Sequence, residues 1–486
     1  MKRIVLKKYD MKYFREELII HPLNIILLFF ISTSTVVFQA DLAINFHKTV
    51  ISFFIISASG IAIYFLIRWI IKDRVKSAIL LTAILFITLF FRDIYELLTY
   101  SGVTKLLSNF SIFVGELFFA IIIVGLVLAP IIIWLYKTKR KLLKLNSYLN
   151  LLTTIFLVIE IIGFGIIEAT KVELKNKIHF KEPLEKIQNK PDIYFIILDG
   201  YTGFSGLQKY WNFENSELKK FLKINGFFIA EKGKTIYNVT NYSIASTFNM
   251  SELNFEADNL YAKSSYLSLA NIIQKNIVVE HFYEIGYDFI NLSFFDIRDK
   301  KKFYEDIYFL KSGNIYQSRS IYGHLYEFYN ELSTDMAFIN LNIFNRLKNM
   351  RSAPNKKPKF IYAHIMMPHP PYYFDAEGNK NNSKVANDSK NQMSYLEQLK
   401  YTNHLLMETL KSILNPNGNP PIIVVQGDHG FRHFKEKNKK DVEFSVLSCY
   451  YFPGQDYSLF TDSMKTINTF RLIFNKYFNQ DFQLLN

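Results

Sequence analysis

The first third of the chain alternates long apolar stretches with short charged ones. Five apolar stretches are found near residues 19–39, 48–71, 75–91, 109–136 and 147–167. Each is about as long as a helix that crosses roughly 30 Å of hydrocarbon. The pattern therefore predicts an all-α transmembrane domain of five helices over residues 1–170. The first stretch begins late and lacks a small-residue cleavage site, so this domain is expected to stay as an anchor.

The basic residues in this region indicate its orientation. Fifteen lysines and arginines precede the first stretch, separate the second from the third, or precede the fifth, and only Lys48, Arg92 and Lys105 lie in the opposite loops. The positive-inside rule then places the N-terminus in the cytoplasm and everything after about residue 170 outside. The formal net charge of +14 is largely explained by this topology, so no nucleic-acid partner is expected.

The pattern changes from residue 191 onward to short apolar runs that alternate with longer amphipathic segments. The runs cover residues 193–199, 289–295, 360–366 and 422–428. Strands that alternate with helices predict right-handed βαβ units and a mainly parallel sheet covered on both faces. The predicted organisation is a transmembrane domain at 1–170, a Lys-rich linker at 171–190 and an extracytoplasmic α/β domain at 191–486.

Three further residues qualify this division. The single cysteine, Cys449, excludes an internal disulfide framework and is expected to be buried in a strand rather than to act as a nucleophile. Glu116 and Glu160 are ionisable groups in or beside the apolar stretches, where such groups are expensive. Glu116 is expected to pair between helices or to lie near an interface. For Glu160 a role in a headgroup or substrate path stays open.

Polar side chains follow three of the four predicted strands. The first strand ends in Asp199, the third contains His364 with His369 just beyond, and the last ends in Asp428-His429 between two glycines. In open α/β sheets, ligands bind at the carboxyl ends of the strands. Two carboxylates and an imidazole suit a Zn²⁺, Mn²⁺ or Mg²⁺ ion. The flanking glycines are expected to let the backbone turn sharply there.

The alternative to a metal site is structural. Asp428 would then cap the next helix, and His429 would be a surface histidine. A lone Asp-His-Gly tripeptide would favour this alternative. The presence of Asp199 and His369 at neighbouring strand ends favours the metal hypothesis instead.

Three segments resemble a known family. The segments PDIYFIILDGY (191–201), AHIMMPHPPYYFD (363–375) and VVQGDHGFR (424–432), in this order, resemble the alkaline phosphatase superfamily. The likeness is to its membrane-anchored, sulfatase-like branch, which includes lipoteichoic acid synthases and phosphoethanolamine transferases. It covers roughly residues 190–480. The resemblance implies an α/β/α sandwich in which one divalent metal ion activates a threonine or serine for attack on a phosphodiester.

The nucleophile of this family begins a helix some tens of residues after the first metal carboxylate. The candidates are Thr202, Thr240, Ser243, Ser246 and Thr247. The segment YNVTNYSIASTFNM (237–250) matches the pattern of the branch and indicates Thr240, whereas Thr202 is too close to Asp199. The alternative is that Thr240 or Ser243 only caps a helix.

The resemblance also implies roles for the other site residues. Asp199, Thr240, Asp428 and His429 would hold the metal ion. His369 would contact the transferred phosphate, a leaving group or a second ion. His364 is expected to be a packed residue or to support a ligand, and His433 could be either a ligand or not. Arg432 would pair with a phosphate or lie exposed on a basic loop.

The function implied by the resemblance is phosphotransfer at a membrane. A headgroup derived from a phospholipid donor, phosphoglycerol or phosphoethanolamine, would move onto a cell-envelope glycan or lipid through a phosphothreonine. The expected location is the plasma or inner membrane. The chain lacks the C/S-x-P-x-R pattern that sulfatases need to form formylglycine. The alternatives are a phosphodiester or sulfate ester hydrolase of the same superfamily and a non-catalytic envelope-binding module.

Overall fold

The chain forms two compact units. The computed structural model describes residues 18–39, 46–102, 116–166, 173–181, 190–254, 263–304, 315–323, 325, 335–351, 357–414, 419–434 and 437–485. The membrane unit comprises Met1–Lys171, Ala262–Leu267 and Ile307–Ser333. The α/β unit comprises Val172–Tyr261, Ser268–Asp306 and Thr334–Asn486. The membrane unit therefore includes two segments beyond residue 170.

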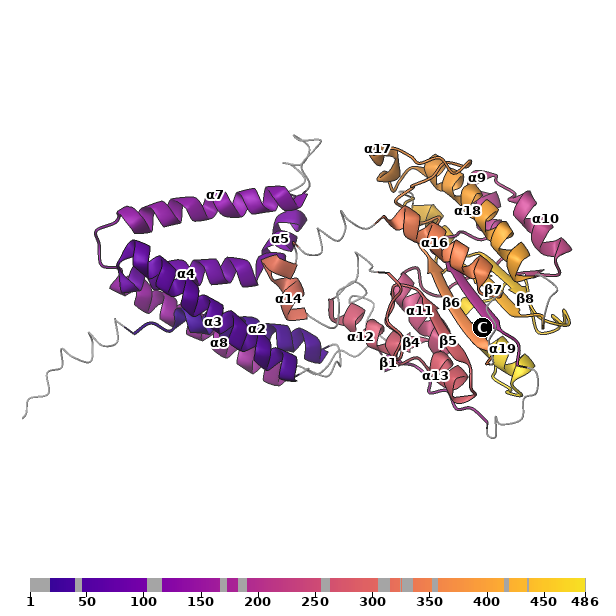
Figure 1. Ribbon diagram of the computed structural model, residues 1–486, viewed down its shortest axis with the longest axis horizontal. Helices are drawn as coiled ribbons and strands as arrows, with labels where there is room; N and C mark the ends of the chain where they lie inside the picture. The colour runs from indigo at the N-terminus through magenta and orange to yellow at the C-terminus, as the bar shows by residue number, and fades with distance from the viewer. Residues whose placement is uncertain are drawn as a thin grey trace, which may run out of the picture. The chain divides into compact units, whose positions relative to one another are not determined.

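Helices alone form the described part of the membrane unit (Figure 1). They are α2 (His21–Gln39), α3 (Phe46–Ile71), α4 (Arg74–Leu89), α5 (Phe91–Tyr100), α7 (Glu116–Lys137), α8 (Leu143–Ile166) and α14 (Ile315–Arg319). Residues Thr49–Ile71 and Leu143–Ile166 are long and apolar enough to cross a membrane. Helices α4 and α5 would make a third span if this pair, bent by 66°, is one span. The expected total of five spans stays a prediction.

Polar side chains join the helices inside the membrane unit. Asn150 accepts hydrogen bonds from the backbone N–H groups of Ile20 and His21 (3.1 Å each). The imidazole of His21 contacts Asn146 and Thr82. These bonds hold the start of α2 against α4 and α8, because a buried polar group is stable only when it is paired. Glu160 is half-buried in α8, and a role for it in a headgroup or substrate path stays a prediction. The side chain of Glu116 lies outside the described residues.

A six-stranded mixed sheet forms the centre of the α/β unit. Its strands are β2 (Ile193–Leu198), β3 (Phe228–Ile229), β5 (Asp288–Leu292), β6 (Lys359–Ile365), β7 (Ile422–Gln426) and β8 (Ser448–Tyr451), in the order β3-β8-β7-β2-β6-β5. Strands β5, β6, β2 and β7 pair in parallel, and β8 pairs antiparallel with both β7 and β3. The four apolar runs predicted from the sequence are these parallel strands. They read as continuous apolar runs because both faces of the sheet are covered.

Helices cover the sheet in two groups. The first group contains α10 (Ser216–Ile224), α16 (Met336–Asn349) and α18 (Gln392–Ile413), and the second contains α11 (Thr240–Asn249), α13 (Ile277–Glu284) and α19 (Thr469–Tyr477). Phe248 of α11 packs edge-on against Phe195 of β2 and Tyr362 of β6, at ring-centroid distances of 5.6 and 4.8 Å. These aromatic contacts fix α11 on the sheet.

Shorter elements complete the α/β unit. They are β1 (Glu173–Leu174), α9 (Phe204–Trp211), β4 (Leu253–Asn254), α12 (Lys263–Gln274), which begins in the membrane unit, α17 (Ser383–Ala386) and the 3₁₀ helices Lys437–Phe444 and Thr466–Asn468. Strand β1 pairs antiparallel with β4, so part of the expected linker at 171–190 is built into this unit. Cys449 is buried in β8, and burial raises the pKa of its thiol, which confirms its structural role.

A buried histidine lies beside the segment that follows β1. The rings of His281 and Phe180 stack at a centroid distance of 3.4 Å, and Phe474 contacts His281 edge-on at 5.2 Å. The Nε2 atom of His281 is buried and has no hydrogen-bond partner in the described part of the chain. Burial lowers the pKa of His281 to about 4. The folded protein therefore holds this imidazole neutral under conditions in which the unfolded chain protonates it.

This histidine should make the fold sensitive to acid. The unfolded chain takes up a proton at His281 near pH 6.5, whereas the folded protein does so only near pH 4. We expect the free energy of unfolding to be unaffected by this group above pH 6.5 and to fall by up to about 3 kcal/mol as the pH drops through this window. Unfolding of the full chain in detergent at several pH values measures the effect.

His281→Phe should remove this part of the pH dependence. His404→Phe, which changes an exposed histidine of α18, should keep it. Identical pH dependence in the wild-type protein and in His281→Phe would contradict the assignment.

Candidate metal centre

The predicted metal ligands lie at one edge of the sheet. Asp199 directly follows β2, and Asp428-His429 follows β7, the parallel neighbour of β2. Gly200 adopts a positive φ of 70°, and its backbone N–H donates to Oδ1 of Asp428 at 3.0 Å. The two strand ends are thus joined directly, and both carboxylates are almost fully buried.

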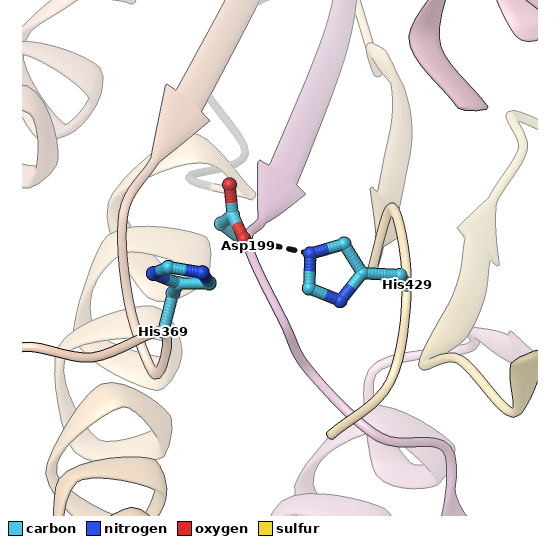
Figure 2. A group of neighbouring side chains, drawn as sticks. All are labelled: Asp199, His369 and His429. Carbon is cyan, nitrogen blue, oxygen red and sulfur yellow. Dashed lines mark ion pairs between the residues drawn. The ribbon is translucent and has the colours of Figure 1, made fainter. Parts of the chain in front are cut away.

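Three electron-pair acceptors converge at this point. Nδ1 of His429 lies 2.7 Å from the carbonyl oxygen of Gly430, and it must carry the proton because a carbonyl only accepts. Nε2 of His429 therefore presents a lone pair. It lies 3.3 Å from Oδ1 of Asp199 and 3.6 Å from Oδ2 of Asp428. Figure 2 shows His429 directed at Asp199 in this way.

The same three atoms have no other partner. Oδ1 of Asp199, Oδ2 of Asp428 and Nε2 of His429 are buried and make no hydrogen bond within the described residues. Burying two carboxylate oxygens and a lone pair together is costly unless a cation compensates them. Ligands of one tetrahedral zinc ion lie about 2.0–2.2 Å from the metal, which puts them at about the separations found here. The residues present therefore fit a divalent metal ion.

A second set of contacts orients Asp199. Nε2 of His364 contacts Oδ2 of Asp199 at 3.1 Å, and the hydroxyl of Tyr362 lies 2.8 Å from Nδ1 of His364. Because the tyrosine hydroxyl can donate to Nδ1, Nε2 is free to donate to the carboxylate. Tyr304 donates to the backbone carbonyl of His364 at 2.8 Å. His364 thus supports a ligand in the way that carboxylate–histidine pairs do around metal sites.

Charge and burial act in opposite directions on Asp199. Burial alone would raise the pKa of Asp199, but the neighbouring imidazole of His369 and the hydrogen bond from His364 hold it well below its usual value. Asp199 therefore stays ionised in this buried position. Asp199 belongs to both sets of potential ligands in the described chain, one with His369 and His429 and one with His364 and Asp428.

Both ring nitrogens of His369 have partners in the structure. Its Nδ1 lies 2.6 Å from the carbonyl oxygen of Pro370, and its Nε2 accepts a hydrogen bond from Nη2 of Arg432 at 3.1 Å. Burial, together with the charge of Arg432, lowers the pKa of His369, although Asp199 partly offsets this. Nη1 of Arg432 also donates to the carbonyl oxygen of Asn238 at 3.3 Å. Arg432 therefore bridges His369 and the residues that lead into α11.

Thr240 is the first residue of α11. The capping position before it is Val239, whose side chain cannot accept hydrogen bonds, so no side chain caps this helix. The threonine is buried, and no hydrogen bond of its hydroxyl is found among the described residues. An uncapped helix N-terminus offers free N–H groups to an anion. Within the described chain, no hydrogen bond or ion pair joins Thr240 directly to Asp199, Asp428 or His429.

Three of the other hydroxyl candidates have structural partners. Oγ1 of Thr202 accepts from the backbone N–H of Phe431 and from Tyr395, both at 3.0 Å. The hydroxyl of Ser243 contacts that of Thr235 at 3.1 Å, and Ser246 donates to the carbonyl of Ser243.

Burial and the nearby His369 and Arg432 lower the pKa of His433 to about 4. His433 belongs to neither potential ligand set.

The glycines around Asp428-His429 are required for a reason other than the sharp backbone turn that the sequence predicted. Neither has a positive φ, so a left-handed turn is not the reason for them. A Cβ on Gly427 would lie 2.5 Å from the carbonyl oxygen of Tyr201, and one on Gly430 would collide with the carbonyl of Val442. Close approach of neighbouring backbone therefore requires glycine at both positions.

One residue of this site, Tyr362, and one role, that of Arg432 as a bridge, escaped sequence reasoning. Tyr362 was not singled out, although a residue two positions before His364 in a strand must lie on the same face. The bridging role of Arg432 left no local signal, because its partners Asn238 and His369 are far away in sequence.

Comparison with known families gives a match to part of the chain. The family model described as Sulfatase matches residues 294–470. The resemblance to the sulfatase-like part of the alkaline phosphatase superfamily is therefore confirmed. The matched residues contain His364, His369 and Asp428-His429, whereas Asp199 and Thr240 precede them.

Several solved structures are similar to the chain at low identity. The C-terminal periplasmic domain of EptC from Escherichia coli, in complex with Zn, has 13% identity and a TM-score of 0.40, and the match covers 63% of this chain and 87% of that one. The corresponding domain of phosphoethanolamine transferase EptC from Campylobacter jejuni has 15% identity and a TM-score of 0.39, over 60% of this chain and 90% of that one.

A Bacteroides fragilis protein described as a sulfatase, YidJ, is also similar. It has 12% identity and a TM-score of 0.36, and the match covers 60% of this chain and 75% of that one. Comparison with the curated proteins gives no match.

The α/β unit should be stabilised by a divalent metal ion that binds to the three convergent atoms. With a divalent ion at about 1,000 times its dissociation constant, we expect about 4 kcal/mol of stabilisation. Asp428→Asn should abolish this metal-dependent gain, yet it should not destabilise the metal-free protein, because an amide can donate to Nε2 of His429. Thermal unfolding with a chelator and with added Zn²⁺ measures both effects.

Asp462→Asn is the control, because Asp462 is an exposed carboxylate of the same unit. It should keep the full metal-dependent gain. If Zn²⁺ stabilises Asp428→Asn as much as it stabilises the wild-type protein, Asp428 is excluded as a ligand.

Proposed function

We propose that the chain is a membrane-anchored, metal-dependent phosphotransferase. It moves a headgroup from a phospholipid donor, phosphoglycerol or phosphoethanolamine, onto a cell-envelope glycan or lipid through a phosphothreonine at Thr240. The metal ligands are Asp199, Asp428, His429 and the hydroxyl of Thr240. The catalytic domain lies outside the plasma or inner membrane, to which up to five spans attach it.

One observation carries this proposal. Three buried acceptor atoms without protons converge at the carboxyl edge of the sheet, and Arg432 links this edge through His369 to the residues just before Thr240. A cation site, a guanidinium and an uncapped helix N-terminus are the three features that bind a phosphate. The apolar helices support a substrate that is held in a membrane.

The bound metal ion would supply positive charge that favours the alkoxide of Thr240. In the first step, Oγ of Thr240 bonds to the phosphorus, and the bond from phosphorus to the diacylglycerol oxygen breaks. The proton of the threonine ends on the departing diacylglycerol. In the second step, the oxygen of an acceptor hydroxyl bonds to the phosphorus, the bond from phosphorus to Oγ of Thr240 breaks, and the acceptor proton passes to Oγ, which regenerates Thr240. The N–H groups at the start of α11 and the guanidinium of Arg432 hold the non-bridging oxygens in both steps.

Hydrolysis is the second candidate function. If water replaces the acceptor hydroxyl in the second step, the same site is a phosphodiesterase. A formylglycine-dependent sulfatase is disfavoured because the sequence lacks the C/S-x-P-x-R pattern. Product analysis with a labelled phospholipid distinguishes transfer from hydrolysis.

The nucleophile is tested by substitution of Thr240. Thr240→Ala should lower phosphodiester turnover by at least about 10³-fold, because the covalent step is lost. Thr240→Ser keeps the hydroxyl and should retain part of the activity. Mass spectrometry of the wild-type protein after incubation with phospholipid should find the phosphoryl adduct on Thr240.

Ser243→Ala is the matched control on the same helix, because the hydroxyl of Ser243 already bonds to Thr235. It should keep near wild-type turnover. Full activity in Thr240→Ala would remove the nucleophile from this proposal.

The guanidinium of Arg432 is tested separately. Arg432→Gln should lower kcat/KM by about 10²-fold, because a charged donor to the phosphoryl oxygens is lost. Arg432→Lys should recover only part of this, since an ammonium cannot bind bidentately. Zn²⁺ affinity, measured by titration, should stay unchanged in both variants.

Lys390→Gln removes an exposed basic residue that also faces His433, and it serves as the control. An equal loss of kcat/KM in Lys390→Gln would show that Arg432 acts only through general positive charge.

A further inference from the structure

A groove lies within the membrane unit where α4 packs against both α2 and α3 (Figure 1). Its volume is about 370 Å³, which is within the range of ligand pockets in proteins. Buried Leu81 and Leu85 of α4 line it together with Leu23 of α2 and Ile61 of α3, which are 49% and 59% exposed. The groove therefore opens at the surface of the described helices, where the solvent in a bilayer is lipid.

The shape of the groove follows one face of α4. Its lining residues in this helix are Arg74, Ala78, Leu81 and Leu85, whose spacing of four, three and four positions puts them in one row. Leu85 lies eleven positions after Arg74, so the row extends roughly 16 Å along the helix axis. That length is about half of a hydrocarbon core of roughly 30 Å, and hence about one leaflet. The groove thus has the length and the apolar lining that suit one acyl chain.

Gly60 of α3 keeps the groove open. It is buried and lines the groove, and it does not have a positive φ. A Cβ at this position would lie 3.8 Å from Cδ1 of Ile26 and 3.9 Å from Cδ2 of Leu85, which are ordinary contact distances. Neither the backbone nor close packing therefore requires glycine here, although alanine is more favourable inside a helix. A side chain larger than alanine would occupy the groove.

Positive charge gathers at one end of the groove. Arg74 is its only charged lining residue, and Arg68 follows Tyr64 by four positions, which puts it on the same face of α3. Nη1 of Arg68 is buried and has no hydrogen-bond partner in the described part of the chain. Arg74 and Lys72 are exposed, and none of the ion pairs found among the described residues includes them. An anion at this end would therefore meet unneutralised cations.

Two aromatic residues indicate the depth of this end in the membrane. The hydroxyl of Tyr64 donates to the backbone carbonyl of Arg74 at 3.5 Å, and Trp69 is 76% exposed. Tyrosine and tryptophan are enriched where the membrane meets water. In the topology predicted from the basic residues, this end lies at the cytoplasmic face. The groove then extends from the interface, where phosphate groups lie, toward the middle of the bilayer.

We propose that this groove binds one anionic phospholipid, with an acyl chain along α4 and the phosphate between Arg68 and Arg74. Basic sites between helices at the cytoplasmic side bind anionic headgroups by charge, and the apolar groove adds the burial of one chain. This inference does not rest on the proposed function. In the predicted topology the charged end faces away from the catalytic side of the membrane, so the bound lipid is a component of the membrane unit and is not the headgroup donor.

The charged end is tested by lipid titration of the full-length protein in detergent, read by native mass spectrometry. The wild-type protein should bind one phosphatidylglycerol at least about fivefold more tightly than phosphatidylcholine with the same acyl chains. Arg68→Gln and Arg74→Gln should each lower the affinity for phosphatidylglycerol about fivefold and leave that for phosphatidylcholine unchanged. Arg140→Gln changes an exposed arginine between α7 and α8 and, as the control, should keep the wild-type affinities.

The apolar part is tested by filling it. Gly60→Leu should lower the affinity for both lipids by at least about tenfold, because the leucine occupies space that the acyl chain needs. Gly60→Ala should keep most of the binding, since its Cβ makes only ordinary contacts. Gly163→Leu is the matched control in α8, because a Cβ there would have no atom within 4 Å, and it should bind both lipids as the wild-type protein does.

Four results would overturn the proposal. They are equal wild-type affinities for the two lipids, an equal loss in Arg140→Gln and Arg74→Gln, unchanged lipid binding in Gly60→Leu, and displacement of phosphatidylglycerol by inorganic phosphate. The last result would show a phosphate site that makes no use of the groove. If Gly60→Leu does not fold, Arg74→Gln decides, because its exposed position tolerates glutamine.

Discussion

The site depends on one constraint, which is that three buried acceptor atoms meet with no proton among them. Each ligand has one polar atom bonded to the protein and one left over. Nε2 of His364 donates to Oδ2 of Asp199, and the backbone N–H of Gly200 donates to Oδ1 of Asp428. Nδ1 of His429 donates to the carbonyl oxygen of Gly430. The remaining atoms point at one another. The protein fixes these side chains through its own hydrogen bonds, and a bound cation would compensate the atoms that are left over.

The sequence predicted this edge of the sheet because parallel strands leave a strong local signal. Strands covered on both faces are continuous apolar runs, and the residue after each run lies at the same edge. The strand around Cys449, β8, was expected only as a buried strand, and its antiparallel pairing with β7 was not predicted, because a short run such as SCYY carries no signal for the direction of its neighbour. The reason for Gly427 and Gly430 was also misjudged. Positive φ can be guessed from a turn sequence, but close approach to the carbonyls of Tyr201 and Val442 depends on tertiary packing.

Local sequence patterns predict only part of the structure of the membrane unit. Hydropathy found the apolar stretches, but the bend between α4 and α5 arises without a proline inside either helix. Helix α14 has five residues, too few for a periodic pattern. Its partners Asp93 and Phe30 lie more than two hundred positions earlier in the chain. Nothing near Tyr316 or Arg319 in the sequence indicates that they belong to another unit, so only the fold could show it.

The hydrogen bonds around the centre argue for one metal ion rather than two. A second ion would need further imidazole lone pairs. Both ring nitrogens of His364 are used, by Tyr362 and Asp199, and the free nitrogen of His369 already accepts from Arg432. His433 belongs to neither potential ligand set of the described chain. The positive charge that a second ion would bring to a phosphate is instead present as the guanidinium of Arg432, which is always protonated and presents several donors in a fixed plane. In the proposed reaction, a site built this way would need one cation for the hydroxyl of Thr240 and would use a side chain for the phosphoryl oxygens.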